Sequence, residues 1–199
     1  MRRVARIVTA PATTPVSVAE AKLQMRVTFS EDDTLIGIYV SAATALCEQI
    51  LQRKLITQTW KMYLDSWPAW VDVLFGDLQS VTHIKYTDYA GVQSTLDSTK
   101  YSVDAISVPG RIILKDGESW PSDTLNVVNP IEIQFVTGYG ATSADIPADI
   151  RNAILLTASH LYENRENYIV GTAADLSIEE VPGTAATLLN NHRVWQWIL

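Results

Sequence analysis

Residues 135–149 read FVTGYGATSADIPAD, and this stretch separates two kinds of local sequence. An alternating, strand-like run ends at Gly138-Tyr139-Gly140, and a helical pattern begins near Pro147. Strand, Gly-x-Gly and helix in this order are also found in dinucleotide-binding loops. However, Ser143 holds the third glycine position of that motif, and Asp145 lies where a phosphate would approach the helix amides. We therefore predict a turn that ends a strand, and no phosphate site.

Upstream of this turn, residues from about 57 to 138 are predicted to form a β-rich insertion. Turn signals such as Pro109-Gly110 and Asp116-Gly117 divide it into pieces of strand length. No helical period lies between the pieces, so the pairing is expected to be antiparallel. The predicted strands are 58–64, 71–75, 81–88, 101–104, 111–114 and 131–137.

Helices are predicted on both sides of the insertion, at about 17–27, 31–54 and 147–167. Ser17 and Glu20 form a capping-box pattern at the start of the first, and Arg53 and Lys54 close the second. The predicted fold class is α+β: a helical core of two long helices and a short N-terminal helix, with the insertion between the long helices. A C-terminal tail, 183–199, follows. Residues 1–199 are expected to form a single domain.

The helix predicted at 31–54 carries an apolar stripe at helical spacing, which we expect to face the core. Its centre is predicted at Leu35, Tyr39, Ala42, Leu46 and Ile50, widened by Ile36, Ala43 and Cys47. Because Cys47 lies on this stripe, we interpret it as a packing residue and not as a nucleophile.

The composition predicts a globular protein, with 47% hydrophobic residues in a chain of 199. Its formal net charge of -7 disfavours a surface that grips nucleic-acid phosphates. Cys47 is the only cysteine, so no internal disulfide forms, and a cytosolic folding environment is expected. No signal peptide and no membrane-spanning segment are expected.

No residue is predicted to be catalytic, and no cofactor or metal ion is expected. The pair His160 and Glu163, three residues apart on one helix, has the spacing of carboxylate-bridged metal sites, but such sites need further inward carboxylates. We expect an exposed ion pair or hydrogen bond there instead. The Gly-x-Ser-x-Gly motif of a serine hydrolase does not occur in the sequence.

Tryptophan residues are the most informative side chains for binding. Two of them, Trp195 and Trp197, alternate with Ile198 and Leu199 at the end of the chain, and the others are Trp60, Trp67, Trp70 and Trp120. They are either core residues, with the tail packed on its own domain, or anchors for a partner subunit. An apolar, aromatic chain end favours the partner, because chain ends are normally polar.

A set of stretches resembles a known family, in the order of that family. The stretches are VSVAEAKLQMRV (16–27), EDDTLIGIYVSAATALCEQILQRKLITQTW (31–60), LDSWP (64–68), SVTHIKYTD (80–88), YSVD (101–104), FVTGYG (135–140), IPADIRNAILLTASHLYENRE (146–166) and LLNNHRVW (188–195). Together they span most of the chain. The chain resembles the head-tail connector, or adaptor, proteins of tailed bacteriophages and related gene transfer agents.

The resemblance implies a structural subunit without enzymatic activity or cofactor. Subunits of such proteins form a ring, often dodecameric, that binds the portal protein of the filled capsid and receives the tail or a stopper protein. DNA passes through the ring without being read, and an acidic wall would let this polyanion slide. The implied location is the head-tail interface of a virion assembled in the cytoplasm of a bacterial host.

On this interpretation, the tail is the candidate contact with the portal or an adjacent subunit. Its candidate residues are Leu188, Leu189, Arg193, Trp195, Trp197, Ile198 and Leu199. Arg53 and Lys54 are candidates to pair with acidic residues of a neighbour, or are simply favourable charges at a helix end.

Two other function classes remain open from the sequence. A small-molecule or carbohydrate-binding module would place Trp60, Trp67 and Trp70 along one open cleft of the sheet. A hydrolase would need at least two carboxylates that converge in a pocket.

Overall fold

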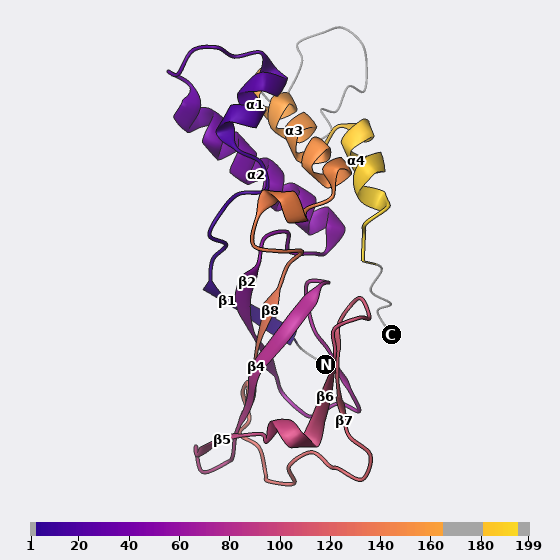
Figure 1. The fold of residues 1–199 in the computed structure, drawn as a ribbon. Coiled ribbons are helices and arrows are strands. Elements are labelled where there is room, and N and C mark those ends of the chain that lie inside the picture. The colour runs from indigo at the N-terminus through magenta and orange to yellow at the C-terminus, as the bar shows by residue number, and fades with distance from the viewer. Residues whose placement is uncertain (1–2, 165–180, 195–199) are drawn as a thin grey trace, which may run out of the picture. The chain divides into compact units, whose positions relative to one another are not determined.

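The computed structural model describes residues 3–164 and 181–194. Among these residues it has four α-helices and two antiparallel sheets, which confirms the predicted α+β class (Figure 1). The chain divides into two compact units. The β-unit comprises the described residues up to Ala12, residues Ile56–Ala141 and Val194, and the helical unit comprises Thr13–Leu55 and the described part of Thr142–Arg193. The single domain expected over 1–199 stays a prediction.

The larger sheet of the β-unit has five strands in the order β1-β2-β8-β4-β5. At its centre, β8 pairs antiparallel with β2 on one side and with β4 on the other. Along β8, buried and half-buried residues alternate, so the sheet has one apolar face and one open face. The strands are β1 (Arg3–Thr9), β2 (Gln58–Leu64), β4 (Leu78–Thr87), β5 (Gln93–Thr95) and β8 (Ile131–Thr137).

The smaller sheet of the β-unit has three strands, in the order β3-β7-β6. They are β3 (Val71–Asp72), β7 (Arg111–Leu114) and β6 (Tyr101–Asp104). The apolar side chains of both sheets form one core cluster, with Phe135 and Met62 among its fully buried members. The two sheets therefore pack against each other through this cluster.

The helical unit contains α1 (Val18–Met25), α2 (Asp33–Leu51), α3 (Ala148–Glu163) and α4 (Gly183–Asn190). The capping box predicted for α1 is present: Ser17 Oγ accepts a hydrogen bond from Glu20 N at 3.2 Å, and Glu20 Oε2 accepts one from Ser17 N at 2.7 Å. The same glutamate pairs with Arg151 of α3. The cap thus also ties α1 to α3.

The buried face of α2 differs from the predicted one by a single residue position. Its buried residues are Ile36, Val40, Ala43, Cys47 and Leu51, whereas Ala42, from the predicted centre, is exposed. Both sets are apolar at helical spacing, so periodicity alone cannot distinguish them. Packing of α2 against the other three helices selects the set with the small residues Ala43 and Cys47.

By length and composition alone, α2 is also apolar enough to cross a membrane. This criterion alone does not contradict the expectation that no segment spans a membrane, which stays a prediction. Core helices pass the same test, and α2 packs against α1, α3 and α4 in the helical unit. We describe α2 as a core helix.

The turn after β8 is an element of the β-unit rather than a phosphate loop. Gly138 has a positive φ of 132°, and Gly140 accepts a hydrogen bond from Thr57 N at 2.8 Å. Further on, in the helical unit, Asp145 Oδ2 accepts hydrogen bonds from Thr142 N and Thr142 Oγ1, both at 2.9 Å. The carboxylate of Asp145 thus caps the short 3₁₀ turn Ser143–Asp145, which precedes α3.

Candidate functional site

Arg53 follows the end of α2 and contacts the predicted C-terminal tail just after α4. Its Nε donates a hydrogen bond to the His192 carbonyl at 2.7 Å. The ring of His192 in turn lies 2.5 Å from Asp149 Oδ2, at the start of α3. Burial raises the pKa of Asp149, but the His192 contact outweighs it and leaves this pKa below its ordinary value. The ends of three helices are thereby joined where the tail begins.

Lys54 is held by an ion pair inside its own chain. Its Nζ lies 2.7 Å from Glu48 Oε2, and Glu48 Oε1 accepts a hydrogen bond from Leu55 N at 3.0 Å. This contact bridges six residues, because Gln52 takes a left-handed conformation and turns the chain back after α2. The pairing of Arg53 and Lys54 with a neighbouring subunit stays a prediction.

The other candidate residues of the tail differ in exposure. Leu189 is buried on α4, Leu188 is half-buried, and Arg193 is exposed. The predicted contact residues Trp195, Trp197, Ile198 and Leu199 lie outside the described residues. Leu189 is therefore a core residue of α4. The contact surface proposed for this region consists of the other candidate residues of the tail.

The tryptophans of the β-unit do not form one open cleft. Trp60 packs on Phe75 with ring centroids 4.6 Å apart, and Trp67 stacks on Trp120 at 4.5 Å. Both Trp60 and Trp67 are packed against the core cluster, whereas Trp70 is 52% exposed. The geometry on which the carbohydrate-binding alternative depended is thus not found.

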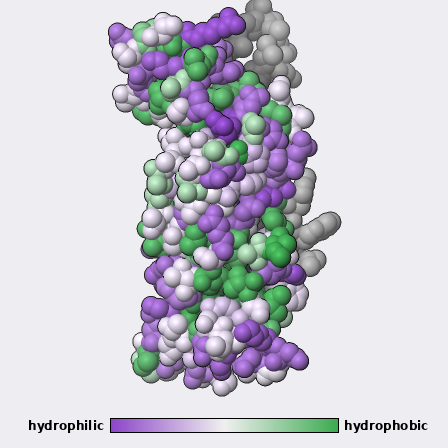
Figure 2. Space-filling view, in the orientation of Figure 1, coloured by the Kyte–Doolittle hydropathy of each residue, from purple (hydrophilic) through white to green (hydrophobic). Residues whose placement is uncertain are grey.

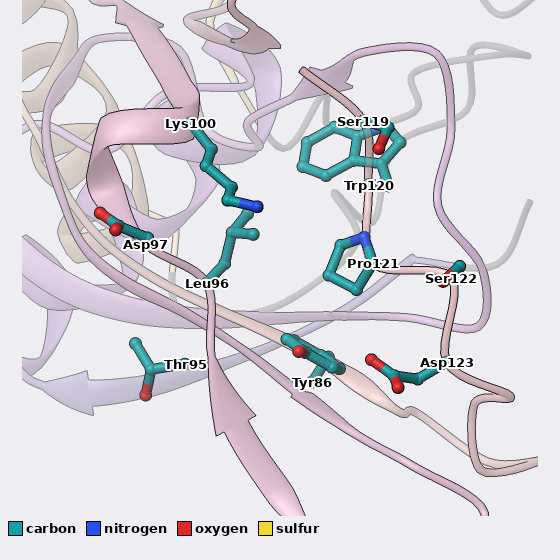
Figure 3. Close-up of a pocket in the computed structure, with 10 residues that line it drawn as sticks. All are labelled: Tyr86, Thr95, Leu96, Asp97, Lys100, Ser119, Trp120, Pro121, Ser122 and Asp123. Carbon is teal, nitrogen blue, oxygen red and sulfur yellow. The ribbon is translucent and has the colours of Figure 1, made fainter.

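A pocket of about 400 Å³ lies beside this stack, at the loop that follows β7 (Figure 3). Trp120 and Tyr86 contribute its aromatic side chains, and Asp97, Lys100 and Asp123 contribute its charges. Trp120 is fixed there by a hydrogen bond of 2.7 Å from its Nε1 to the Pro68 carbonyl. The sequence did not indicate this pocket, since its residues come from β4, β5 and two loops.

The open face of the larger sheet carries a charged cluster centred on Glu132. Glu132 Oε1 lies 3.0 Å from Lys61 Nζ and 3.2 Å from His83 Nε2. The other oxygen, Oε2, lies 3.2 Å from Tyr63 Oη. Burial raises the pKa of Glu132, but the hydrogen bonds from Lys61, His83 and Tyr63 outweigh it, so this pKa lies below its ordinary value. The cluster requires the register of three strands and has no local sequence signature.

Exposed apolar side chains gather at two loops of the β-unit. Tyr89 and Val127 lie in segments joined by the Asp88↔Leu125 bridge and are 76% and 77% exposed. Ile106, in the loop between β6 and β7, is 95% exposed. Figure 2 shows hydrophobic areas interrupting the hydrophilic surface over this unit. Such areas are typical of contact surfaces.

The described part of the chain has neither a cluster of metal ligands nor a reactive thiol. No three His, Cys, Asp or Glu residues gather there as a metal site. Burial raises the pKa of Cys47 to about 11, which keeps the thiol protonated and agrees with a packing role. His160 Nδ1 lies 3.2 Å from the Asn164 amide nitrogen, so its partner differs from the predicted Glu163.

Three solved structures share this fold over nearly the whole chain. The neck of an empty gene transfer agent (GTA) particle, computed with C6 symmetry, has a chain with TM-score 0.79 and 23% identity, covering 97% of this chain and 96% of that one. The virion of a native GTA particle and the neck of a native GTA particle computed with C12 symmetry each give TM-score 0.75, 24% identity and the same coverage. At such identities the likeness shows the fold.

Comparison with curated protein sequences found no match. The model of the phage gp6-like head-tail connector protein family, in contrast, matches residues 15–109 and 121–193. The match includes all four helices and all strands except β1 and β7. Residues 110–120, which contain β7 and part of the loop beside the pocket, lie in the gap between the two matched ranges. This chain therefore belongs to the phage gp6-like head-tail connector family.

Proposed function

We propose that this structural connector protein forms a ring beneath the portal of a phage-like particle and joins the DNA-filled head to the tail. The observation that supports the proposal most directly is the family match over most of the chain, together with the same fold in GTA necks computed with C6 and C12 symmetry. A chain of this family acts by assembly and not by catalysis. Its place is then the head-tail interface of the virion.

The proposed ring is dodecameric and surrounds the DNA channel. Its partners are further copies of the chain, the portal protein on one side and the tail or a stopper protein on the other. DNA passes through without specific binding, which agrees with a net charge of -7. Neither a cofactor nor a membrane takes part, and assembly takes place in the host cytoplasm.

The tail from Leu188 to Leu199 is the proposed contact with the portal or an adjacent subunit. The side chain of Arg53 binds the carbonyl of His192 and so anchors this tail ahead of residues 193–199. Such an anchor lowers the entropy that these last residues lose on binding. Arg53 is half-buried and contacts the backbone of His192, the residue before the exposed Arg193, so both arginines are assigned to one contact surface.

The mass of the purified protein, alone and with its portal protein, tests this function. Native mass spectrometry or light scattering is expected to give a complex with about twelve copies of the chain once portal is present. Connector subunits that wait for the portal will be monomers before that step. A chain that remains monomeric in the presence of portal would overturn the proposed function.

A further inference from the structure

The open face of the larger sheet is a cationic surface on an acidic protein. Arg6 is paired in register with Lys61, Lys61 with Gln134, and Gln134 with His83, so these four side chains share one face. In the next row, Tyr63 is opposite Glu132, and Glu132 is opposite Lys85. We call Arg6, Lys61, His83 and Lys85, with Glu132, the cationic face.

This cationic face is not neutralised within its own unit. Its three lysine and arginine side chains share a single carboxylate, that of Glu132. This carboxylate already forms an ion pair with Lys61 and hydrogen bonds with His83 and Tyr63. Within the described residues, neither Arg6 nor Lys85 makes an ion pair. The like charges of Arg6 and Lys61 are also directly opposite each other, which is destabilising unless an anion lies nearby.

A second surface of the β-unit carries the opposite charge. It consists of four carboxylates and two lysines around the pocket and the loop that follows β7: Asp97, Asp116, Glu118, Asp123, Lys100 and Lys115. Lys100 lies 3.8 Å from Glu118, and within the described residues Asp123 has no hydrogen-bond or ion-pair partner. We call this surface the acidic edge. Its charge of about -2 matches the excess of the cationic face.

The acidic edge is held in place before any partner binds. Trp120, in the middle of the loop, stacks on Trp67 with an interplanar angle of 6° and donates to the Pro68 carbonyl. The main chain also fixes the loop, since Lys115 N donates to the Lys100 carbonyl at 3.0 Å. A surface fixed in this way loses little conformational entropy on binding.

The two surfaces make no ion pair with each other within one chain. Among the described residues, none of the lysine and arginine side chains of the cationic face pairs with a carboxylate of the acidic edge. The surfaces adjoin at β4, where Lys85 belongs to the cationic face, while the pocket is lined by the next residue, Tyr86, and by Thr95, which is opposite Lys85. A contact that pairs the two surfaces joins different patches of two copies and is heterologous, the type of contact that closes into a ring.

We propose that the cationic face of one copy binds the acidic edge of the next copy around the ring. The chemistry is that of arginine and lysine side chains with carboxylates, and the aromatic rings of Trp120 and Tyr86 in the pocket provide a second attraction for a cation. This inference rests on the proposed ring and assigns the subunit contact within it.

Zero-length cross-linking of rings assembled on the portal tests the contact. A carbodiimide joins a lysine amine to a carboxylate that it touches, and rings made from ¹⁴N- and ¹⁵N-labelled copies distinguish links between copies from links within one. The expected products join the peptides of Lys61 or Lys85 in one copy to those of Asp97 or Asp123 in another. The proposal is overturned if the rings are intact but Lys61 and Lys85 are cross-linked only to carboxylates outside the acidic edge.

Charge reversal provides the second arm of the experiment. Arg6→Glu places a carboxylate opposite Lys61, so the fold is retained while the cationic face loses its excess of positive charge. Both Arg6→Glu and Asp123→Arg are expected to raise the concentration needed for ring formation at least tenfold, and the double variant to restore it. Arg26→Glu, an exposed reversal on the helical unit, is the control and leaves assembly unchanged.

The outcomes separate this inference from the proposed function. Wild-type rings on the portal, with both single reversals assembling as wild type does, overturn the subunit contact and leave the connector function in place. A wild-type chain that never joins the portal overturns both. Reversals that leave assembly unchanged but weaken binding to duplex DNA would identify the cationic face as a DNA contact, and the proposal would be wrong.

Discussion

Gly138 shows how one residue joins segments that lie far apart in the chain. A Cβ atom at this position would lie 2.7 Å from Thr57 N and 2.8 Å from Ile56 O, both of them backbone atoms. Its φ of 132° is one that other residues rarely adopt. The glycine is therefore required twice, by its conformation and by the close approach of the chain that leads into β2.

Replacement of Gly138 by alanine is expected to destabilise the protein by about 2 kcal/mol or more, because the chain around Ile56 and Thr57 must move. Gly91→Ala is the matched control, since Gly91 also has a positive φ, of 84°, but open space around it. That change is expected to cost about 1 kcal/mol. Urea denaturation measures both values. Equal midpoints for the two variants would show that the close approach of Ile56 and Thr57 to position 138 adds nothing to the loss of stability.

At the residue scale, local features such as turns were predicted from the sequence, whereas the contacts of individual residues were not. The turn at Gly138 follows from local signals, but its contact with Ile56 and Thr57 depends on the fold. For the same reason the ion pair of Lys54 with Glu48 was not foreseen, because it requires the left-handed turn at Gln52.

At the element scale, strands with their own periodicity were predicted and strands that depend on a neighbour were not. The predicted ranges for β2, β6, β7 and β8 agree with the structure, because alternation and turn residues are local signals. In contrast, β1 and β5 were missed. The pairing of β1 with β2 joins residues at least fifty positions apart, and residues 3–9 carry little alternation of their own.

The three strands β2, β8 and β4 are also linked across the open face by Glu132. Its pKa is below the ordinary value of 4.5, so the carboxylate stabilises the fold above that pH, and this stabilisation is lost as the pH falls through the lowered pKa. Glu132→Gln is expected to lower the free energy of unfolding at pH 7 by about 1–2 kcal/mol. It should also flatten the acid limb of the stability curve below about pH 4.5.

Denaturant unfolding at a series of pH values from 7 to about 3 checks this expectation. Glu118→Gln is the control, because that side chain is 40% exposed and its ion pair with Lys100 spans 3.8 Å. Its effect is expected to stay below about 0.5 kcal/mol. If the two variants lose the same stability at pH 7, the hydrogen bonds to Glu132 do not stabilise the sheet.

At the scale of the whole molecule, the tail is expected to serve assembly and not stability. Deletion of residues 195–199 should change the free energy of unfolding by less than about 0.5 kcal/mol and weaken binding to the portal at least tenfold. The deletion begins after Val194, because that side chain is buried, with 4% exposure. Val194→Ala, by contrast, is expected to cost about 1–3 kcal/mol.

Thermal melting and portal pull-down of the two variants provide the measurement. A deletion variant that no longer melts cooperatively would show that the tail belongs to the core of its own chain. A deletion variant that binds the portal as tightly as the full chain would remove the tail from the contact surface.

The division into two units, and the pairing of charged surfaces, could not be predicted from the sequence. The open face of the larger sheet has no local signature, since Arg6, Lys61 and Lys85 become neighbours only through strand register. Helices α1, α2 and α3 were predicted, whereas α4 lies within the predicted C-terminal tail. The rotation of α2 was not predicted, because Ala43 and Ala42 are both apolar positions at helical spacing. Function followed from the ordered set of family-like stretches and not from any single site.

The insertion of the β-unit also sets the order of events on the ribosome. Residues Ile56–Ala141 separate the two parts of the helical unit. At about 5–20 residues per second, these roughly 86 residues take about 4–17 seconds to synthesise. During that time the apolar face of α2 has emerged without α3 to cover it. The nascent chain is therefore expected to expose its most apolar helix for seconds, which makes this stage of translation the most prone to aggregation.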